Sequence, residues 1–557
     1  MRGIFFYVAA IAVLSAALFV PAQRAFFVAD DFEFLSTAKS ALANPSSIPH
    51  LLITNHAGNR DGGSYRPLMT LSIIADLAFF GPSPLSFHLT SLFLHLLVVF
   101  LVGLLSWRLF KSHQVGITLL AVIFFSTAHF HAEPVLWIGS RADLLATAFL
   151  LAAAISFLAF LKTGRVRAGL LTLFFTALAL MSKEFAITAP LIFLILAAWQ
   201  KKESLRERRV WLIISGAVAL VIGFFFVRAY ATGFFAANYL HEPLTITSLA
   251  LKGWNFLFAA LPMFFVGGRW RTATTLFFLD HLWLAVALAV VILVWLIMLL
   301  RRRQDAGWLM LLTIISAAPA AAFFTINTFR GAVDDGGERY LYYPSVWFVL
   351  WLATAVINWW SSAGKKMRLA LMVLIIIFIV GNSFLLLRKA RWHARAGISV
   401  QKMLVSYAEQ KSTKPHGEIF LWLPDNYNGA HLLSHPFFKL ATQFLYDDDQ
   451  ADTIFVPVNI ALTADQDRVK NFTFTQASSG FIFTANQGYP FRGPEFLESE
   501  DYILKLTDLV GARARRYEIQ MTKNFWRTNR DKEIQYFLFD GGEFLHLTDP
   551  PGGRYTE

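Results

Sequence analysis

The chain has 557 residues, of which 56% are hydrophobic and only 15% are charged. Soluble domains carry about 25% charged residues, so much of this chain is expected to lie in a lipid bilayer. The net charge of +12 indicates basic cytoplasmic loops rather than a nucleic-acid partner, and the absence of cysteine excludes disulfides, thiolate metal sites and cysteine nucleophiles.

The first apolar run, residues 3–20, follows a basic start at Arg2. Small residues at Ala22 and Ala25 would also suit a cleaved signal peptide. The run is long for a signal core, and many more apolar runs follow it. We therefore interpret it as a retained first membrane helix.

Further apolar runs follow along the first two thirds of the chain. They lie at residues 86–107, 115–130, 143–161, 168–182, 185–199, 210–228, 280–300, 307–327, 340–360 and 368–387. Basic clusters separate alternate pairs of runs, at residues 108–111, 162–167, 201–209, 301–303 and 365–368. Lys and Arg gather in cytoplasmic loops, so about eleven spans with a cytoplasmic N-terminus place every one of these clusters inside.

Two shorter apolar stretches do not fit this topology. Residues 68–80 carry Asp76, and residues 254–268 are broken by Pro262 and by glycines. Either stretch, counted as a crossing, would reverse the charge pattern that follows it. We predict a helix at the outer membrane interface for the first and a re-entrant or interfacial segment for the second.

The character of the chain changes near residue 390, where polar residues become more frequent. Short β-like runs follow at residues 419–424, 453–462, 472–476, 481–485, 517–521 and 534–539. Connectors such as SSG and DGG are typical of hairpins. We therefore predict a membrane domain over residues 1–390 and an extracytoplasmic soluble α+β domain over residues 391–557.

Four segments that this topology places outside carry both carboxylates and cations. The candidate residues are Asp30, Asp31, Tyr65 and Arg66 in the first, His131, Glu133, Arg141 and Asp143 in the second, Lys183 and Glu184 in the third, and Arg330, Glu338, Arg339 and Tyr340 in the last. An aspartate can take the proton of an attacking hydroxyl, while Arg and Lys can hold a phosphate and stabilise the charge that develops on the leaving oxygen. The mixture suits transfer to a hydroxyl from a phosphate-activated, lipid-borne donor.

Structural interpretations stand beside this one. The acidic pair can cap the next helix, and Glu133 with Arg141, or Glu338 with Arg339, can form structural ion pairs. His88 and His95, on one face of the second span, are each expected to hydrogen-bond to a neighbouring helix.

The motifs YRPL (65–68), FHLTSLFLH (87–95), HAEPVLWIGSRADLL (131–145), SKEFAIT (182–188) and ERYLYYPSVWF (338–348) resemble, in this order, the transmembrane O-mannosyltransferases that carry tetratricopeptide repeats. Those proteins are GT-C glycosyltransferases, which use polyprenyl-phosphate sugars. The resemblance implies a GT-C membrane fold with juxtamembrane helices in the first external loop, and an inverting transferase of the hexosyl or mannosyl type. It implies Asp30 and Asp31 as the catalytic pair and the matching residues of the later motifs as binders of the donor.

The chain also departs from this family. Ser140 stands in place of a glycine, Phe185 in place of a glutamine, and an α+β domain follows where the family has its repeats. These departures leave the acceptor open and favour a prokaryotic inner membrane with the site on the periplasmic or external face.

We expect the acceptor hydroxyl to attack the anomeric carbon with help from Asp31 or Asp30, while Arg and Lys side chains hold the departing polyprenyl phosphate. Asp31 is slightly favoured as the base, because the FEFL sequence that follows predicts the start of a helix. No cofactor is required, although a divalent metal ion between the acidic pair and Asp143 is possible. The partners are then a polyprenyl-phosphate sugar, a hydroxyl-bearing acceptor and the bilayer.

The alternative function is a transporter or flippase of a lipid-linked glycan, which would need charges near the midplane of the membrane and paired broken helices.

Overall fold

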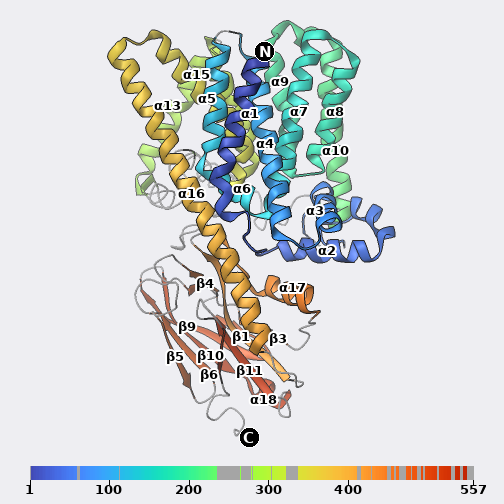
Figure 1. Ribbon diagram of the computed structural model, residues 1–557, viewed down its shortest axis with the longest axis vertical. Coiled ribbons are helices and arrows are strands. Elements are labelled where there is room, and N and C mark those ends of the chain that lie inside the picture. The colour runs from blue at the N-terminus through green and yellow to red at the C-terminus, as the bar shows by residue number, and fades with distance from the viewer. Residues whose placement is uncertain are drawn as a thin grey trace. The chain divides into compact units, whose positions relative to one another are not determined.

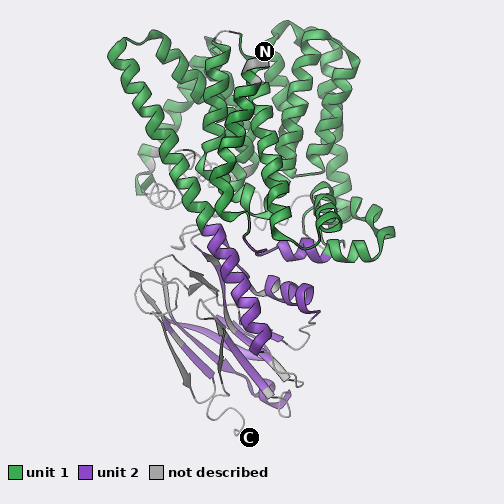
Figure 2. Cartoon of the chain, in the orientation of Figure 1, with its two compact units in different colours: residues 1–24, 37–326, 336–391 green, residues 25–36, 327–335, 392–557 purple. Residues whose placement is uncertain are grey.

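The computed structural model describes residues 2–58, 63–111, 113–234, 264, 277–278, 280–302, 304–321, 337–410, 416–427, 430–447, 453–456, 459–462, 472–477, 480–485, 491–492, 496–510, 513–528, 533–539 and 544–547. They divide into two compact units (Figure 2). The first takes in the described parts of residues 1–24, 37–326 and 336–391, and the second those of residues 25–36 and 392–557. Arg330 and, except for Phe264, the segment 254–268 lie outside the described residues.

The first unit is helical (Figure 1). Its α-helices are α1 (Arg2–Ala16), α3 (Pro67–Phe80), α4 (Pro84–Leu109), α5 (Gln114–Thr127), α6 (Ala132–Leu136), α7 (Arg141–Thr163), α8 (Val166–Leu180), α9 (Ala189–Gln200), α10 (Arg208–Thr232), α13 (Leu282–Arg301), α14 (Asp305–Ala321) and α15 (Tyr342–Ser362). Short 3₁₀ turns join them: η1 (Ala17–Ala22), η2 (Pro45–Leu52), η3 (His129–His131), η4 (Ile138–Ser140), η5 (Glu184–Thr188), η6 (Lys202–Arg206) and η10 (Glu338–Leu341). Helices α2 (Asp31–Ala43) and α16 (Lys365–Gln410) contribute residues to both units.

Local sequence explains where many of these helices begin and end. Pro67 and Pro84 stand at the first position of α3 and α4, where the missing N–H costs no hydrogen bond. Helices α7 and α10 end at Gly164 and Gly233, whose φ angles of 66° and 76° lie in the left-handed region that glycine adopts readily. Local sequence therefore sets where α3 and α4 begin and where α7 and α10 end.

Nearly all the described residues of the apolar runs predicted to span the membrane lie on helices, so the prediction of a helical membrane protein is confirmed. Within the described ranges, five helices are long and apolar enough to cross a bilayer, or six if the pair α5 and η3–α6, bent by 55°, counts as one. The other apolar helices are shorter, so the number of eleven spans remains a prediction. The expected helix at residues 68–80 is observed as α3, while its place at the membrane interface remains a prediction.

The second unit is built on a β-sheet. Its elements after α16 are β1 (His416–Tyr427), β2 (Ala430–His431), α17 (His435–Tyr446), β3 (Thr453–Phe455), β4 (Asn459–Leu462), β5 (Phe472–Ala477), β6 (Gly480–Ala485), β7 (Phe491–Arg492), β8 (Phe496–Glu498), β9 (Tyr502–Val510), β10 (Arg513–Met521), α18 (Lys523–Thr528), β11 (Glu533–Phe539) and β12 (Phe544–Leu547). The order along the sheet is β12-β11-β1-β4-β7-β10-β6-β5, with β2 and β3 paired to β1 and β8 and β9 continuing from β10. The six predicted strand regions are confirmed, while β2, β7, β8, β9 and β12 were not predicted.

Strand β1 is central to this unit because it pairs in parallel with β11, β3 and β4. Its Phe420 packs against Phe438 of α17, at 4.8 Å between ring centroids, and against Phe537 of β11 at 5.1 Å. Tyr407, near the end of α16, covers the same cluster and donates its hydroxyl to the Glu418 carboxylate at 2.8 Å. The C-terminal half of α16 and α17 are therefore anchored to the sheet by a common aromatic core.

Candidate functional site

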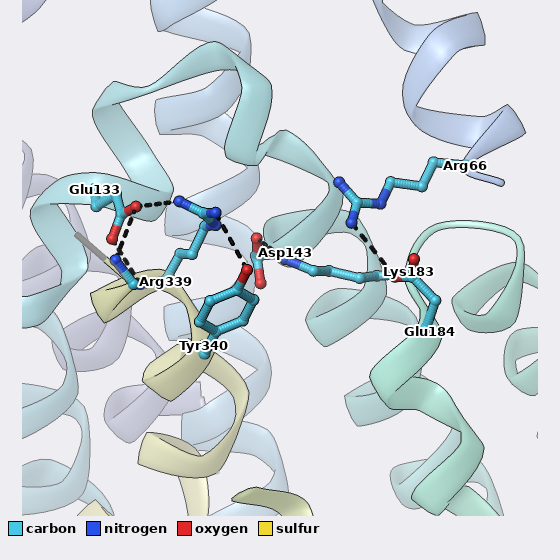
Figure 3. Close-up of polar contacts among 8 residues, drawn as sticks. Arg66, Glu133, Asp143, Lys183, Glu184, Arg339 and Tyr340 are labelled. Carbon is cyan, nitrogen blue, oxygen red and sulfur yellow. Dashed lines mark hydrogen bonds and ion pairs between the residues drawn. The ribbon is translucent and has the colours of Figure 1, made fainter. Parts of the chain in front are cut away.

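Three loops of the membrane unit bring charged side chains together (Figure 3). Glu133 lies on α6, Asp143 on the first turn of α7, Lys183 just before η5, and Arg339 and Tyr340 on η10. Figure 3 shows them in a row that continues through Glu184 to Arg66, at the start of α3. We call these seven residues, Arg66, Glu133, Asp143, Lys183, Glu184, Arg339 and Tyr340, the polar row.

Arg339 is held in place from several sides. Its guanidinium forms an ion pair with Glu133, and its backbone N–H donates to the same carboxylate at 3.0 Å. The guanidinium carbon lies 4.5 Å from the Trp137 ring centroid and 4.8 Å from that of Tyr340, and Nη2 donates to the Tyr340 hydroxyl at 3.2 Å. With 21% of its side chain exposed, Arg339 is a fixed cation that an anion can still approach.

Lys183 forms the most deeply buried ion pair of the polar row. Its ammonium lies 2.5 Å from Oδ2 of Asp143, and the two side chains are 5% and 0% exposed. The ammonium also lies 5.2 Å from the centroid of the Tyr340 ring. Oδ1 of Asp143 is buried and has no hydrogen-bond partner among the described residues. Burial lowers the pKa of the Lys183 ammonium to about 8, against the opposing attraction of Asp143, and the charges of Arg66 and Arg339 lower it too.

Arg66 and Glu184 form the end of the polar row. Their side chains lie 3.5 Å apart and are each 16% exposed. Neighbouring Tyr65 is buried and donates its hydroxyl to the Leu52 carbonyl at 2.8 Å, so it fixes the loop from which Arg66 extends. The polar row thus holds three cations and three carboxylates, with the cations Arg66, Lys183 and Arg339 spread along it.

Arg141 lies apart from this row, although the sequence placed it among the donor-binding groups. It is fully buried, pairs with Asp76 at 2.7 Å, and donates to the Phe87 carbonyl at 2.9 Å. Further hydrogen bonds of 3.3 Å run to Ser72 and Ser91. Arg141 therefore joins α7 to α3 and α4, and this geometry favours a structural role over contact with a phosphate.

The two structural ion pairs considered from sequence, Glu133 with Arg141 and Glu338 with Arg339, are replaced by other pairings. Glu133 pairs with Arg339, and Glu338 pairs with Lys389 of α16. Sequence reasoning had not singled out Lys389. The signal available was its position next to Arg388 at the end of an apolar run, which in the sequence resembles an ordinary flanking charge.

His131 is placed among aromatic and hydroxyl groups and not in the polar row. Its Nε2 lies 3.0 Å from the Ser345 hydroxyl, and its ring centroid lies 4.7 Å from that of Tyr342. The Tyr342 hydroxyl lies 2.8 Å from Nδ1 of His95, which confirms the expected hydrogen bond of His95 to a neighbouring helix. This histidine cluster ties α4, η3 and α15 together at the base of the loops that carry the polar row.

The acidic pair of the first loop belongs to the second unit. Asp31 begins α2, as predicted, and its Oδ2 accepts the backbone N–H of Val28 at 2.9 Å. Asp31 is 2% exposed, while Asp30 is half-buried and its carbonyl accepts the N–H of Glu33 at 3.0 Å. Asp31 therefore orders the turn, and Asp30 is the more exposed residue of the two, with its Oδ1 buried.

No group of three or more His, Asp or Glu side chains within the described ranges is arranged to hold a metal ion. The acidic groups of the polar row face cations instead.

Curated proteins with a similar sequence match a limited part of the chain. Protein O-mannosyl-transferase Tmtc1 of Drosophila melanogaster is 34% identical over 130 residues, which is 23% of this chain and 15% of that protein. Protein O-mannosyl-transferase TMTC1 of Homo sapiens is 32% identical over 143 residues, which is 24% of this chain and 16% of that protein. The chain resembles the O-mannosyltransferases. The resemblance that the motifs indicated is thus confirmed, and the chain spans about 15% of the length of the curated relatives it matches.

Solved structures match more of the chain at lower sequence identity. ArnT from Cupriavidus metallidurans bound to undecaprenyl phosphate is 11% identical, with a TM-score of 0.41 over 82% of this chain and 92% of that chain. The oligosaccharyltransferase AglB from Archaeoglobus fulgidus, in complex with an inhibitory peptide and a dolichol-phosphate, is 13% identical, with a TM-score of 0.44 over 84% of this chain and 65% of that chain. No family model matches the chain.

Proposed function

We propose that this protein is an inverting glycosyltransferase of the GT-C type, which moves a sugar of the mannosyl type from a polyprenyl-phosphate donor to an acceptor hydroxyl. The observation that carries the proposal is the polar row, in which three loops fix Lys183 and Arg339 against carboxylate partners and a shared tyrosine. The similarity to the O-mannosyltransferases supports this choice of chemistry.

In this proposal the polar row binds the phosphate of the donor. Lys183 uses one of its three N–H donors on Asp143, so two remain for phosphate oxygens. The guanidinium of Arg339 is held between Trp137 and Tyr340, so it can meet a phosphate without reorganisation. Negative charge develops on the phosphate as the sugar leaves. Cations already held in position therefore stabilise the transition state more than they stabilise the bound donor.

The reaction is a single displacement at the anomeric carbon. The acceptor oxygen forms the new bond on one face, the bond between the anomeric carbon and the phosphate oxygen breaks on the other, and polyprenyl phosphate leaves with both electrons. The acceptor proton passes to a carboxylate, for which we propose Asp30, because Asp31 is 2% exposed and already holds the Val28 N–H. The assignment of this acidic pair to the reaction rests on its match to the motif of the resembled family.

We further propose that the polar row lies on the extracytoplasmic face. Three of the basic clusters predicted to be cytoplasmic supply Lys111, Lys201 and Arg301 to one cavity of about 760 Å³, so those loops lie at a common end of the membrane unit. The polar row lies at the opposite end of α9 from one of these loops, since α9 follows Lys183 and Glu184 through η5 and ends at Gln200, next to Lys201. The positive-inside rule then assigns the row to the outer side.

Transfer from undecaprenyl-phosphate mannose to serine, threonine and glycan hydroxyls by the purified full chain tests the proposal. We expect a glycosylated product with an inverted anomeric centre, and no product from the variant with both Asp30→Asn and Asp31→Asn. Full activity of that double variant would exclude the assignment. A transporter would instead move the labelled donor across a proteoliposome membrane and leave every acceptor unmodified, so the same preparation separates the two functions.

A further inference from the structure

The acidic turn of the first loop is packed as part of the C-terminal domain and not as a free loop. Figure 2 shows residues 25–36 in the colour of the second unit. The N–H of Ala29 donates to the carbonyl of Leu432 at 2.9 Å, directly before the Asp30–Asp31 pair. Phe32 is fully buried, and its ring meets that of Phe444 on α17 edge-on, at 6.3 Å between centroids.

The C-terminal half of α16 lies against the backbone of this turn. A Cβ atom added at Gly397 would lie 2.4 Å from the backbone nitrogen of Phe26 and 3.0 Å from the backbone of Ala25. Side-chain atoms are not tolerated at such distances from backbone, so any larger residue must push the two segments apart. Gly397 is needed here for close approach and not for an unusual backbone angle.

The turn itself has a conformation that needs external support. Ala29 has a φ angle of 46°, in the left-handed region that residues with a Cβ rarely adopt. Such a conformation persists where the surroundings determine it. The Leu432 carbonyl and the neighbouring Asp31 carboxylate, which accepts the Val28 N–H, are the groups that hold it.

The partner segment of the C-terminal domain is itself held in place. The N–H of Leu432 donates to the Asp425 carbonyl at 3.0 Å, and β2 pairs with the end of β1. Arg395 of α16 donates to the Tyr427 hydroxyl at 3.1 Å, which ties that end of β1 to the helix that carries Gly397. The support for the turn is thus continuous with the sheet.

We propose that the C-terminal domain sets the conformation of the acidic turn, with Gly397 and Phe444 as positioning residues for Asp30 and Asp31. This inference rests on the proposed function of the acidic pair. The domain then acts as a support for the carboxylate that receives the acceptor proton, and its loss or displacement slows the chemical step while the donor still binds. It explains why a soluble domain follows the membrane helices and why residues 25–36 belong to it.

Gly397→Ala in the full chain tests this role, with Gly381→Ala as its matched control. Both glycines lie in α16, but a Cβ at Gly381 meets nothing within 4 Å. A displacement of about 1 Å in a reacting group can lower turnover by about 100-fold. We therefore expect Gly397→Ala to lower kcat by about 100-fold at an unchanged KM for undecaprenyl-phosphate mannose, and Gly381→Ala to keep the wild-type rate.

Hydrogen–deuterium exchange of the peptide that covers residues 25–36 gives a readout that does not depend on turnover. We expect faster exchange in Gly397→Ala and wild-type exchange in Gly381→Ala. Should Gly397→Ala fail to fold, Phe444→Ala takes its place, with Leu445→Ala, next to it and exposed, as the control. Phe444→Ala is expected to lower kcat and speed exchange of residues 25–36, and Phe444→Tyr to restore both.

Wild-type kcat together with wild-type exchange in Gly397→Ala or Phe444→Ala would overturn the inference, as would a change confined to KM. Failure of the proposed function has a different signature. Asp30→Asn and Asp31→Asn would then leave transfer unchanged, whatever the positioning variants do to the exchange of residues 25–36.

Discussion

Replacing Lys183 with methionine is expected to damage both stability and transfer, for separate reasons. The substitution keeps an unbranched side chain of similar size but leaves the Asp143 carboxylate, which is 0% exposed, without its ion-pair partner. Removing one partner of a buried ion pair costs about 3–5 kcal/mol, and the loss of one group that stabilises developing charge lowers kcat by about 100- to 1000-fold. Thermal unfolding of the purified protein in detergent measures the first effect, and transfer from undecaprenyl-phosphate mannose the second.

The double variant Lys183→Met with Asp143→Asn separates these effects. With both charges removed, we expect most of the stability to return while transfer remains low. Lys201→Met is a matched control, because Lys201 pairs with Glu207 at 3.0 Å with 40% of its side chain exposed, and we expect little change in either assay. Recovery of wild-type transfer in the double variant would show that Lys183 only neutralises Asp143, and would refute its role toward the phosphate.

Three further outcomes follow from the same geometry. Arg141→Met is expected to destabilise the protein by about 3–5 kcal/mol in thermal unfolding, because Asp76 loses its buried partner, while the KM for the donor stays at the wild-type value. A raised KM without destabilisation would show that Arg141 contacts the donor. Asp30→Asn is expected to abolish transfer, and Asp31→Asn to lower it less while exchange of residues 25–36 speeds up; the reverse order would make Asp31 the base. Burial lowers the pKa of Lys183 to about 8 from 10.5, so transfer is expected to fall as pH rises through 8. The stability that depends on Lys183 is expected to rise between pH 8 and 10.5, because the unfolded chain then binds a proton that the folded chain has lost. A transfer rate that stays constant up to pH 10 would contradict a role for the ammonium.

The helices and the strands could largely be predicted from the sequence, because the patterns that indicate them are local. Apolar runs of the right length predict helices, and the short apolar runs around Phe420 and Phe537, bounded by polar residues, predict strands that form the core of the sheet. The convergence of the loops that carry Lys183 and Arg339 was also predictable, because alternating basic clusters indicate which loops share a side of the membrane.

The pairing of individual charges was not predictable in the same way. Whether Glu133 meets Arg141 or Arg339 depends on the rotation of α6 and α7 by a fraction of a turn, and sequence spacing does not specify that rotation. Asp76 was noticed only as an obstacle to a membrane span, whereas its burial is explained by the cation it neutralises. The packing of residues 25–36 on α16 and α17 could likewise not be predicted from the sequence, because no local pattern links segments so far apart in the chain.

A cryo-EM structure of the full chain with undecaprenyl phosphate tests the central claim most directly. We predict density for the phosphate within hydrogen-bond distance of the Lys183 ammonium and the Arg339 guanidinium, with the isoprenoid tail leaving between membrane helices. Density for the phosphate at the opposite basic end, in the cavity lined by Lys111, Lys201 and Arg301, with the polar row unchanged, would contradict the account.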